Sequence, residues 1–163
     1  MRIMLVRHGK AGDRVDWSGD DSTRPLTKKG IEEFQVVARQ LKGYDSEFDK
    51  IYSSPFVRTM QTASILAEHF ELKVEERTEL KYTSDIEDLI IFLKSLKAEG
   101  NYIFVGHDPT LSQFGSMLLT GKADLFIELK KGSAALLTSM RSPAPGEFIL
   151  EWLLPPKFVI QNV

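Results

Sequence analysis

Short apolar runs alternate with longer segments of helical periodicity along most of this chain, and this alternation restricts the fold more than any other feature. Strands are predicted over 2–7, 50–53, 72–75 and 101–106. Apolar residues recur every three or four positions in four further segments, predicted as helices over 27–41, 54–70, 85–97 and 109–119. Strands separated by helices form parallel sheets with helices on both faces. The predicted class is therefore α/β, as a three-layer α/β/α sandwich.

The last part of the chain departs from this alternation. Two strands are predicted over 133–140 and 147–153, joined by the turn-forming residues RSPAPG. Such a hairpin adds an antiparallel edge, so the sheet is expected to be mixed but largely parallel. No repeat, linker or low-complexity segment interrupts the sequence, and 163 residues suit one core. Residues 1–163 are thus predicted to form a single domain.

Residue types at two helix starts suggest where those helices begin. Thr27 precedes the first helix and is a natural N-cap. Ser54 and Pro55 are typical of an N-cap and a first helical position, so the second helix is predicted to begin there. Residues 10–25 are rich in Gly, Asp and Ser and are predicted to form a surface loop.

Composition excludes several functional classes. A net charge of −2 provides no overall positive field for nucleic acid or for an anionic membrane surface. The absence of cysteine excludes disulfides, thiolate metal sites and a cysteine nucleophile. No apolar stretch approaches the roughly 20 residues that span a bilayer, and the run 3–6 is too short for a secretory signal. We therefore expect a cytoplasmic protein with no nucleic-acid or membrane partner.

Charged and imidazole side chains follow the carboxyl ends of three predicted strands. The first strand ends in Arg7, His8 and Gly9, and Arg58 lies one turn into the helix that follows the second. His107 follows the strand 101–106. In open α/β sheets, ligands bind outside the carboxyl ends of the strands. Two arginines and two histidines are therefore expected at one edge of the sheet.

This set of residues favours an anion over a metal cation. Two permanently charged guanidinium groups would repel a metal, whereas their planar forks match phosphate oxygens. A neutral imidazole is also a good nucleophile near neutral pH, and a phosphoryl group is an electrophile that it can attack. The sequence thus predicts a site that holds and attacks a phosphoryl group, with no metal and no cofactor.

Three motifs in this order, LVRHG, SSPFVRTMQTA and VGHDP, make the chain similar to the histidine phosphatase superfamily, also called phosphoglycerate mutase-like. The short length and the segment RPLTKKG at 24–30 resemble SixA-type phosphohistidine phosphatases. The resemblance implies a phosphoglycerate mutase-like fold and a covalent mechanism in which His8 accepts the phosphoryl group. It further implies a phosphate pocket formed by Arg7, Gly9, Arg58 and His107.

A carboxylate in this superfamily usually protonates the leaving group. The residue that looks similar here is Glu79, in the segment RTELKYTSD, although a solvated glutamate is an equal alternative. Lys10 departs from the acidic residue that often follows RHG in the family. Trp17, in the loop after the first motif, is expected either to line a substrate entrance or to cover apolar surface.

The short connection after Glu79 bears on the substrate. Larger members of the superfamily insert a covering segment at this point, whereas only residues 81–84 precede the next predicted helix. An uncovered site favours a large substrate that brings its own binding surface, such as a phosphohistidine displayed on a protein. The alternatives are a phosphomonoester phosphatase for a small metabolite, a mutase, which needs a closed site, and a non-catalytic phosphate-binding module.

Overall fold

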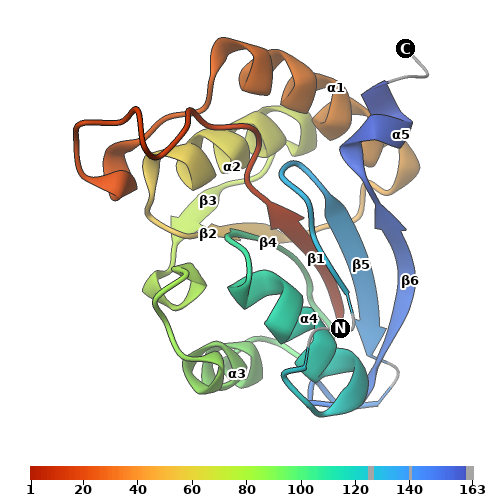
Figure 1. Cartoon of the computed structure of the whole chain (residues 1–163). Coiled ribbons are helices and arrows are strands. Elements are labelled where there is room, and N and C mark those ends of the chain that lie inside the picture. Colours follow the sequence, from red (N-terminus) through yellow and green to blue (C-terminus); the bar gives the residue numbers. More distant parts are fainter. Residues whose placement is uncertain (125–126, 140, 161–163) are drawn as a thin grey trace.

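A six-stranded mixed sheet forms the centre of the protein in the computed structural model, which describes residues 1–124, 127–139 and 141–160 (Figure 1). The strand order is β3-β2-β4-β1-β5-β6. The strands are β1 (Arg2–Arg7), β2 (Lys50–Ser53), β3 (Val74–Glu76), β4 (Asn101–Gly106), β5 (Ala134–Ser139) and β6 (Phe148–Leu154). The first four are parallel, and β5 and β6 add the antiparallel edge. The mixed sheet predicted from the sequence is confirmed.

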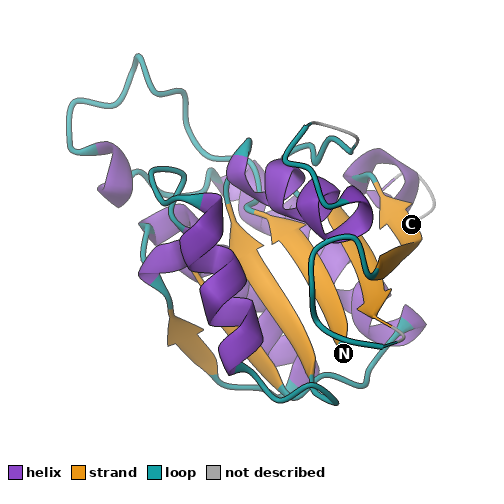
Figure 2. Cartoon of the chain, turned by 90° about the horizontal axis from the view of Figure 1, so that it is seen from below, coloured by secondary structure: helices purple, strands orange, loops and turns teal. Residues whose placement is uncertain are grey.

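Helices cover both faces of this sheet, as Figures 1 and 2 show. Their bounds are α1 (Lys28–Tyr44), α2 (Val57–Phe70), α3 (Ile86–Ser95), α4 (Thr110–Thr120) and α5 (Pro156–Ile160). In β1, Met4 and Val6 pack in one core with α1, α2 and α5. Ile3 and Leu5 pack in the other core with α3 and α4. This alternation along one strand, with a period of two, produces the three-layer sandwich.

The two predicted helix starts have different outcomes. The Thr27 hydroxyl oxygen accepts a hydrogen bond from the Gly30 amide at 2.9 Å, so the predicted N-cap is confirmed. Helix α2, in contrast, begins at Val57 with Phe56 as a cap that makes no side-chain hydrogen bond. The prediction of a helix start at Ser54 is wrong, because the Ser54 amide still donates to Val105 of β4 at 3.0 Å.

Several other bounds differ by a few residues from the prediction. Strand β3 lies at 74–76 and not at 72–75, and helix α3 ends at Ser95 and not at Lys97. Helix α5 was not predicted at all. Residue 140, which the predicted strand 133–140 includes, lies outside the described residues. None of the helices within the described ranges is long and apolar enough to cross a membrane.

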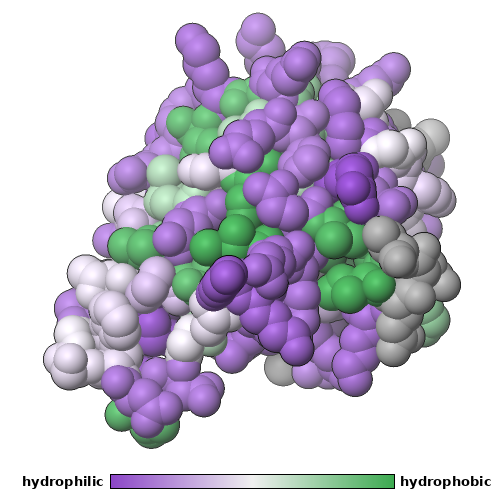
Figure 3. Space-filling view, turned by 90° about the horizontal axis from the view of Figure 1, so that it is seen from above, coloured by the Kyte–Doolittle hydropathy of each residue, from purple (hydrophilic) through white to green (hydrophobic). Residues whose placement is uncertain are grey.

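Residues 10–25 form an ordered arm that projects from the body beside α1 and α2 (Figures 1 and 2). The arm contains a short 3-10 helix, η1 (Asp21–Thr23), and Arg24 donates hydrogen bonds to Asp21 and to the Gly12 carbonyl. At the base of the arm, the backbone of Lys10 packs directly against Gly30. A β-carbon at position 30 would lie only 2.0 Å from the Lys10 carbonyl oxygen. Glycine is needed at position 30 for this close approach. Seen from above, the arm extends at the lower left of a largely hydrophilic surface (Figure 3).

Candidate active site

The two arginines and two histidines predicted for the site lie together at one edge of the sheet: Arg7, His8 and His107 lie at the carboxyl ends of β1 and β4, and Arg58 lies on the first turn of α2. His8 directly follows β1, and its amide donates to the Gly106 carbonyl of β4 at 3.1 Å. The His8 and His107 ring centroids are 5.3 Å apart. Arg7 and Arg58 are close enough for their charges to act on both imidazole rings. The parallel pairing of β1 and β4 thus produces the grouping that the strand-end rule predicts.

His8 is held as a neutral imidazole, and one of its ring nitrogens, Nε2, has no hydrogen-bond partner among the described residues. Its Nδ1 lies 2.7 Å from the Gly9 carbonyl oxygen, and because a carbonyl only accepts, Nδ1 carries the proton. The pKa of His8 is lowered from 6.5 to about 3, mainly by burial and also by the nearby charges of Arg58 and Arg7, while the bond to Gly9 opposes this shift. At neutral pH the Nε2 lone pair is therefore available to attack an electrophile.

Terminal nitrogens of each guanidinium group in the site donate hydrogen bonds that hold the side chain in place. Arg7 donates from Nη1 to the Leu129 carbonyl at 2.6 Å, and this nitrogen lies 3.7 Å from Asp108. Arg58 is 3% exposed, and it donates to the Asp21 carbonyl oxygen at 2.6 Å and to the Asp21 carboxylate at 2.9 Å. The Nε of each arginine is buried and has no hydrogen-bond partner among the described residues. Both guanidinium groups therefore keep unused donors.

His107 also keeps an unused polar atom. Its Nε2 lies 2.9 Å from the Ser54 hydroxyl, whereas its buried Nδ1 has no partner within the described part of the chain. Burial lowers the pKa of His107 to about 2, and the neighbouring His8 and Arg58 contribute to this shift, so the ring carries one proton. If the Ser54 hydroxyl donates to Nε2, the proton of His107 lies on Nδ1. The ring then offers a third unused donor beside the two arginines.

Ser54→Ala should remove this control of the His107 tautomer. We expect kcat to fall roughly tenfold, less than the loss of a whole anion-binding donor, while Ser54→Thr, which keeps the hydroxyl, should retain more activity. Side-chain ¹⁵N NMR should show the proton of His107 on Nδ1 in the unmodified protein and a mixture of tautomers in Ser54→Ala. A proton found on Nε2 of the unmodified protein would contradict the assignment.

Gly9 and Glu79 have surroundings that differ from those expected. The Gly9 amide donates to the Thr62 hydroxyl at 3.1 Å, so its backbone donor is occupied and the residue holds His8 in place. We therefore do not propose Gly9 as a phosphate ligand. Glu79 lies half-buried in the short helix η2 (Thr78–Leu80), and its carboxylate accepts a hydrogen bond from the Thr78 hydroxyl. No described contact joins its carboxylate to the histidines or arginines, and its role as an acid stays a prediction.

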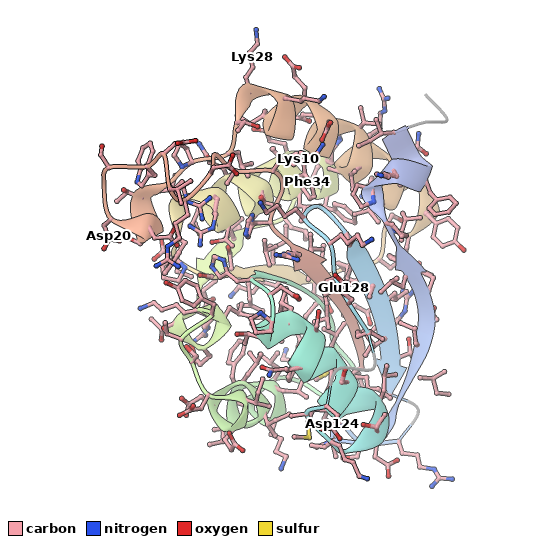
Figure 4. The ribbon with its side chains drawn as sticks, viewed as in Figure 1. Lys10, Asp20, Lys28, Phe34, Asp124 and Glu128 are labelled. Atoms are coloured by element: carbon pink, nitrogen blue, oxygen red, sulfur yellow. The ribbon has the colours of Figure 1, made fainter. Side chains whose placement is uncertain are left out.

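Lys10 directs its ammonium group toward α1 and pairs with Glu33 at 2.8 Å. Figure 4 shows it beside Phe34 of that helix. The side chain that replaces the acidic residue of the family motif is thus engaged by a neighbouring carboxylate.

Besides the contact of Ser54 with His107, sequence reasoning missed three side chains that surround the site. Asp21, from the projecting arm, binds Arg58. The Phe56 and Tyr82 rings pack against His107 with centroid distances of 4.8 and 5.6 Å. Tyr82 belongs to the short connection after Glu79, and this connection therefore contributes one ring beside His107. In the described residues, no group of three His, Cys, Asp or Glu side chains could hold a metal ion.

Comparisons with known proteins agree with this geometry. The sequence model of the histidine phosphatase superfamily (branch 1) matches residues 3–84. An uncharacterized protein of Picosynechococcus is 30% identical over 95% of this chain and 100% of its own length. Phosphohistidine phosphatase SixA of Escherichia coli is 26% identical over 96% of this chain and 94% of its own length.

The fold is also similar to that of a solved structure, the protein histidine phosphatase SixA complexed with tungstate. The TM-score is 0.85, with 26% identity over 97% of this chain and 99% of the other. The range that the family model matches includes Arg7, His8 and Arg58. The chain therefore belongs to the histidine phosphatase superfamily, branch 1, as a phosphatase of the SixA type.

Proposed function

We propose that this phosphatase acts through a covalent phosphohistidine on Nε2 of His8, and that its main substrates are phosphohistidines on proteins. One observation carries the first part. A neutral histidine with a free Nε2 lies among three buried groups that lack a partner in the described residues, namely Nε of Arg7, Nε of Arg58 and Nδ1 of His107. Buried donors without partners are costly, and a bound phosphoryl group would satisfy all three.

In the first step, Nε2 of His8 attacks phosphorus and forms a P–N bond. The bond from phosphorus to the leaving atom breaks, and that atom takes the bonding electron pair. The guanidinium groups of Arg7 and Arg58 stabilise the phosphoryl oxygens as charge redistributes. The bond from His8 Nδ1 to the Gly9 carbonyl steadies the positive charge that the phosphorylated ring acquires. The arginines supply the charge that a metal-dependent phosphatase obtains from its ions.

In the second step, water attacks phosphorus and the P–N bond to His8 breaks. The electron pair returns to Nε2, which restores the neutral ring, and phosphate leaves while the water loses a proton to solvent. The low pKa of His8 favours this return, since the buried site disfavours a charged imidazole.

Phosphohistidine and phosphate esters differ in the leaving group that the first step releases. A phosphohistidine whose second ring nitrogen is protonated departs as neutral imidazole, so no acid must deliver a proton in that step. An ester leaves as an alkoxide unless it is protonated, and the one expected acid, Glu79, has no described contact with the site. The similarity to SixA, which is a phosphohistidine phosphatase, supports the same choice. The cytoplasmic location and the single-domain organisation stay predictions.

A comparison of substrates tests this proposal. With a chelator present throughout, kcat/KM should be higher for a histidine-phosphorylated carrier protein than for sugar phosphates or nucleotides. Glu79→Gln should slow any ester hydrolysis more than phosphohistidine hydrolysis, because only the alkoxide needs a proton. A small ester that proves the better substrate would replace our proposal with the metabolite-phosphatase alternative, and complete inhibition by the chelator would contradict the metal-free mechanism.

A further inference from the structure

A pocket of about 420 Å³ lies between the projecting arm, Phe56 at the start of α2, and Tyr82. Its wall includes three aromatic side chains, Trp17, Phe56 and Tyr82. Phe56 and Tyr82 are the same rings that pack edge-on against His107. The pocket therefore shares a wall with the proposed phosphoryl site, and the expectation that Trp17 lines an entrance is consistent with its position there.

The polar part of the pocket is formed by the arm. Asp21 is held between Arg24 and Arg58, which connects this wall to the site. Asp20 is exposed at the outer end of the arm, where Figure 4 labels it. Arg14 is the cation among the described lining residues. The pocket thus offers the Phe56 and Tyr82 rings near His107. Farther out lies the Asp20 carboxylate, whose Oδ1 accepts from the Ser22 amide and hydroxyl and whose second oxygen can accept a further hydrogen bond.

We propose that this pocket receives the imidazole ring of the substrate phosphohistidine, so that the enzyme recognises the leaving group as well as the phosphoryl group. This inference rests on the proposed function. The imidazole of phosphohistidine is bonded directly to phosphorus, so it must lie next to the phosphoryl site, where the aromatic wall begins. Rings favour offset or edge-to-face contact with other rings, and an aliphatic ester has no such face. The volume left over accommodates main chain of the carrier, whose N–H groups would meet Asp20.

Two small compounds with the same bond type isolate the effect of the ring. Phosphoramidate and phosphoimidazole both contain a P–N bond, and only the second carries a ring. In Trp17→Ala and in Tyr82→Ala, the ratio of kcat/KM for phosphoimidazole to that for phosphoramidate should fall about fivefold, the size expected of one ring–ring contact. Tyr44→Ala is the matched control, because Tyr44 is 75% exposed on α1 and packs on Trp152. Its ratio should equal that of the unmodified protein.

Each of the other outcomes has a distinct meaning. An unchanged ratio in both aromatic variants overturns the pocket assignment and leaves the proposed function intact. If the two aromatic variants lost activity only toward a nucleoside monophosphate, the pocket would bind a nucleobase. That result would also overturn the assignment of the pocket to the imidazole ring. If the unmodified enzyme cleaves neither P–N compound and no histidine-phosphorylated carrier protein either, the proposed function fails, and this inference fails with it. If it cleaves the carrier protein but not phosphoimidazole, only the pocket assignment is overturned. Thermal unfolding of the two variants, whose positions lie in separate segments, guards against a shared folding defect.

Discussion

Replacing His8 with alanine should abolish both phosphatase turnover and the phosphoryl label on the enzyme. The neutral Nε2 is the atom that forms the covalent bond, and alanine leaves nothing in its place. Quenched unmodified enzyme should carry phosphate that is lost in acid and survives alkali, as expected for a P–N bond. His69→Ala is the matched control, because His69 lies on α2 and bonds Gln35 at 2.8 Å. That variant should keep both label and turnover.

The same variant has a second readout in stability. The pKa of His8 is about 3 in the folded protein, against an ordinary value of 6.5. The unfolded chain therefore binds this proton more tightly, and the folded protein loses stability as the pH falls through the range between these values. His8→Ala lacks this loss, so its free energy of unfolding should decline less on acidification than that of the unmodified protein. Near-normal turnover, or parallel stability curves, would show that the nucleophile or its environment is assigned wrongly.

The site arginines and histidines could be predicted because topology alone brings them together. A parallel sheet places the carboxyl ends of β1 and β4 at one edge, whatever the details of packing. To predict the positions of Arg7, His8 and His107, it was enough to identify two buried strands correctly. Arg58 needed one more step, since it lies on the first turn of α2 and not at a strand end.

Ser54 and Asp21 could not be predicted in the same way, because their contacts are tertiary. The local sequence Ser54-Pro55 favours a helix cap, yet the backbone there still bonds β4, and its hydroxyl meets His107. Asp21 lies in a polar segment whose composition indicates only a loop. Its contact with Arg58 depends on how the arm folds back, and nothing in the periodicity of either segment encodes that.

The second large effect is expected at the two arginines of the site. Arg7→Ala and Arg58→Ala should each lower kcat on the order of 10² or more, as found for loss of one preformed anion-stabilising donor. Each variant removes a buried Nε donor that has no partner in the described residues, together with its charge. Arg58→Lys restores the charge without the planar fork, so it should recover only part of the rate.

Arg2→Ala is the matched control for these variants. Arg2 lies on the same strand as Arg7, at the opposite end of the sheet, and pairs with Asp45. Its loss should affect stability but leave kcat unchanged. The Asp21 carboxylate accepts a hydrogen bond from Nη2 of Arg58 and so orients the guanidinium without supplying its charge. Asp21→Asn should therefore lower kcat less than Arg58→Ala does, and it should also raise KM. If both arginine variants lose only about tenfold or less, a smaller effect than removal of such a donor produces, phosphoryl transfer takes place elsewhere on the protein.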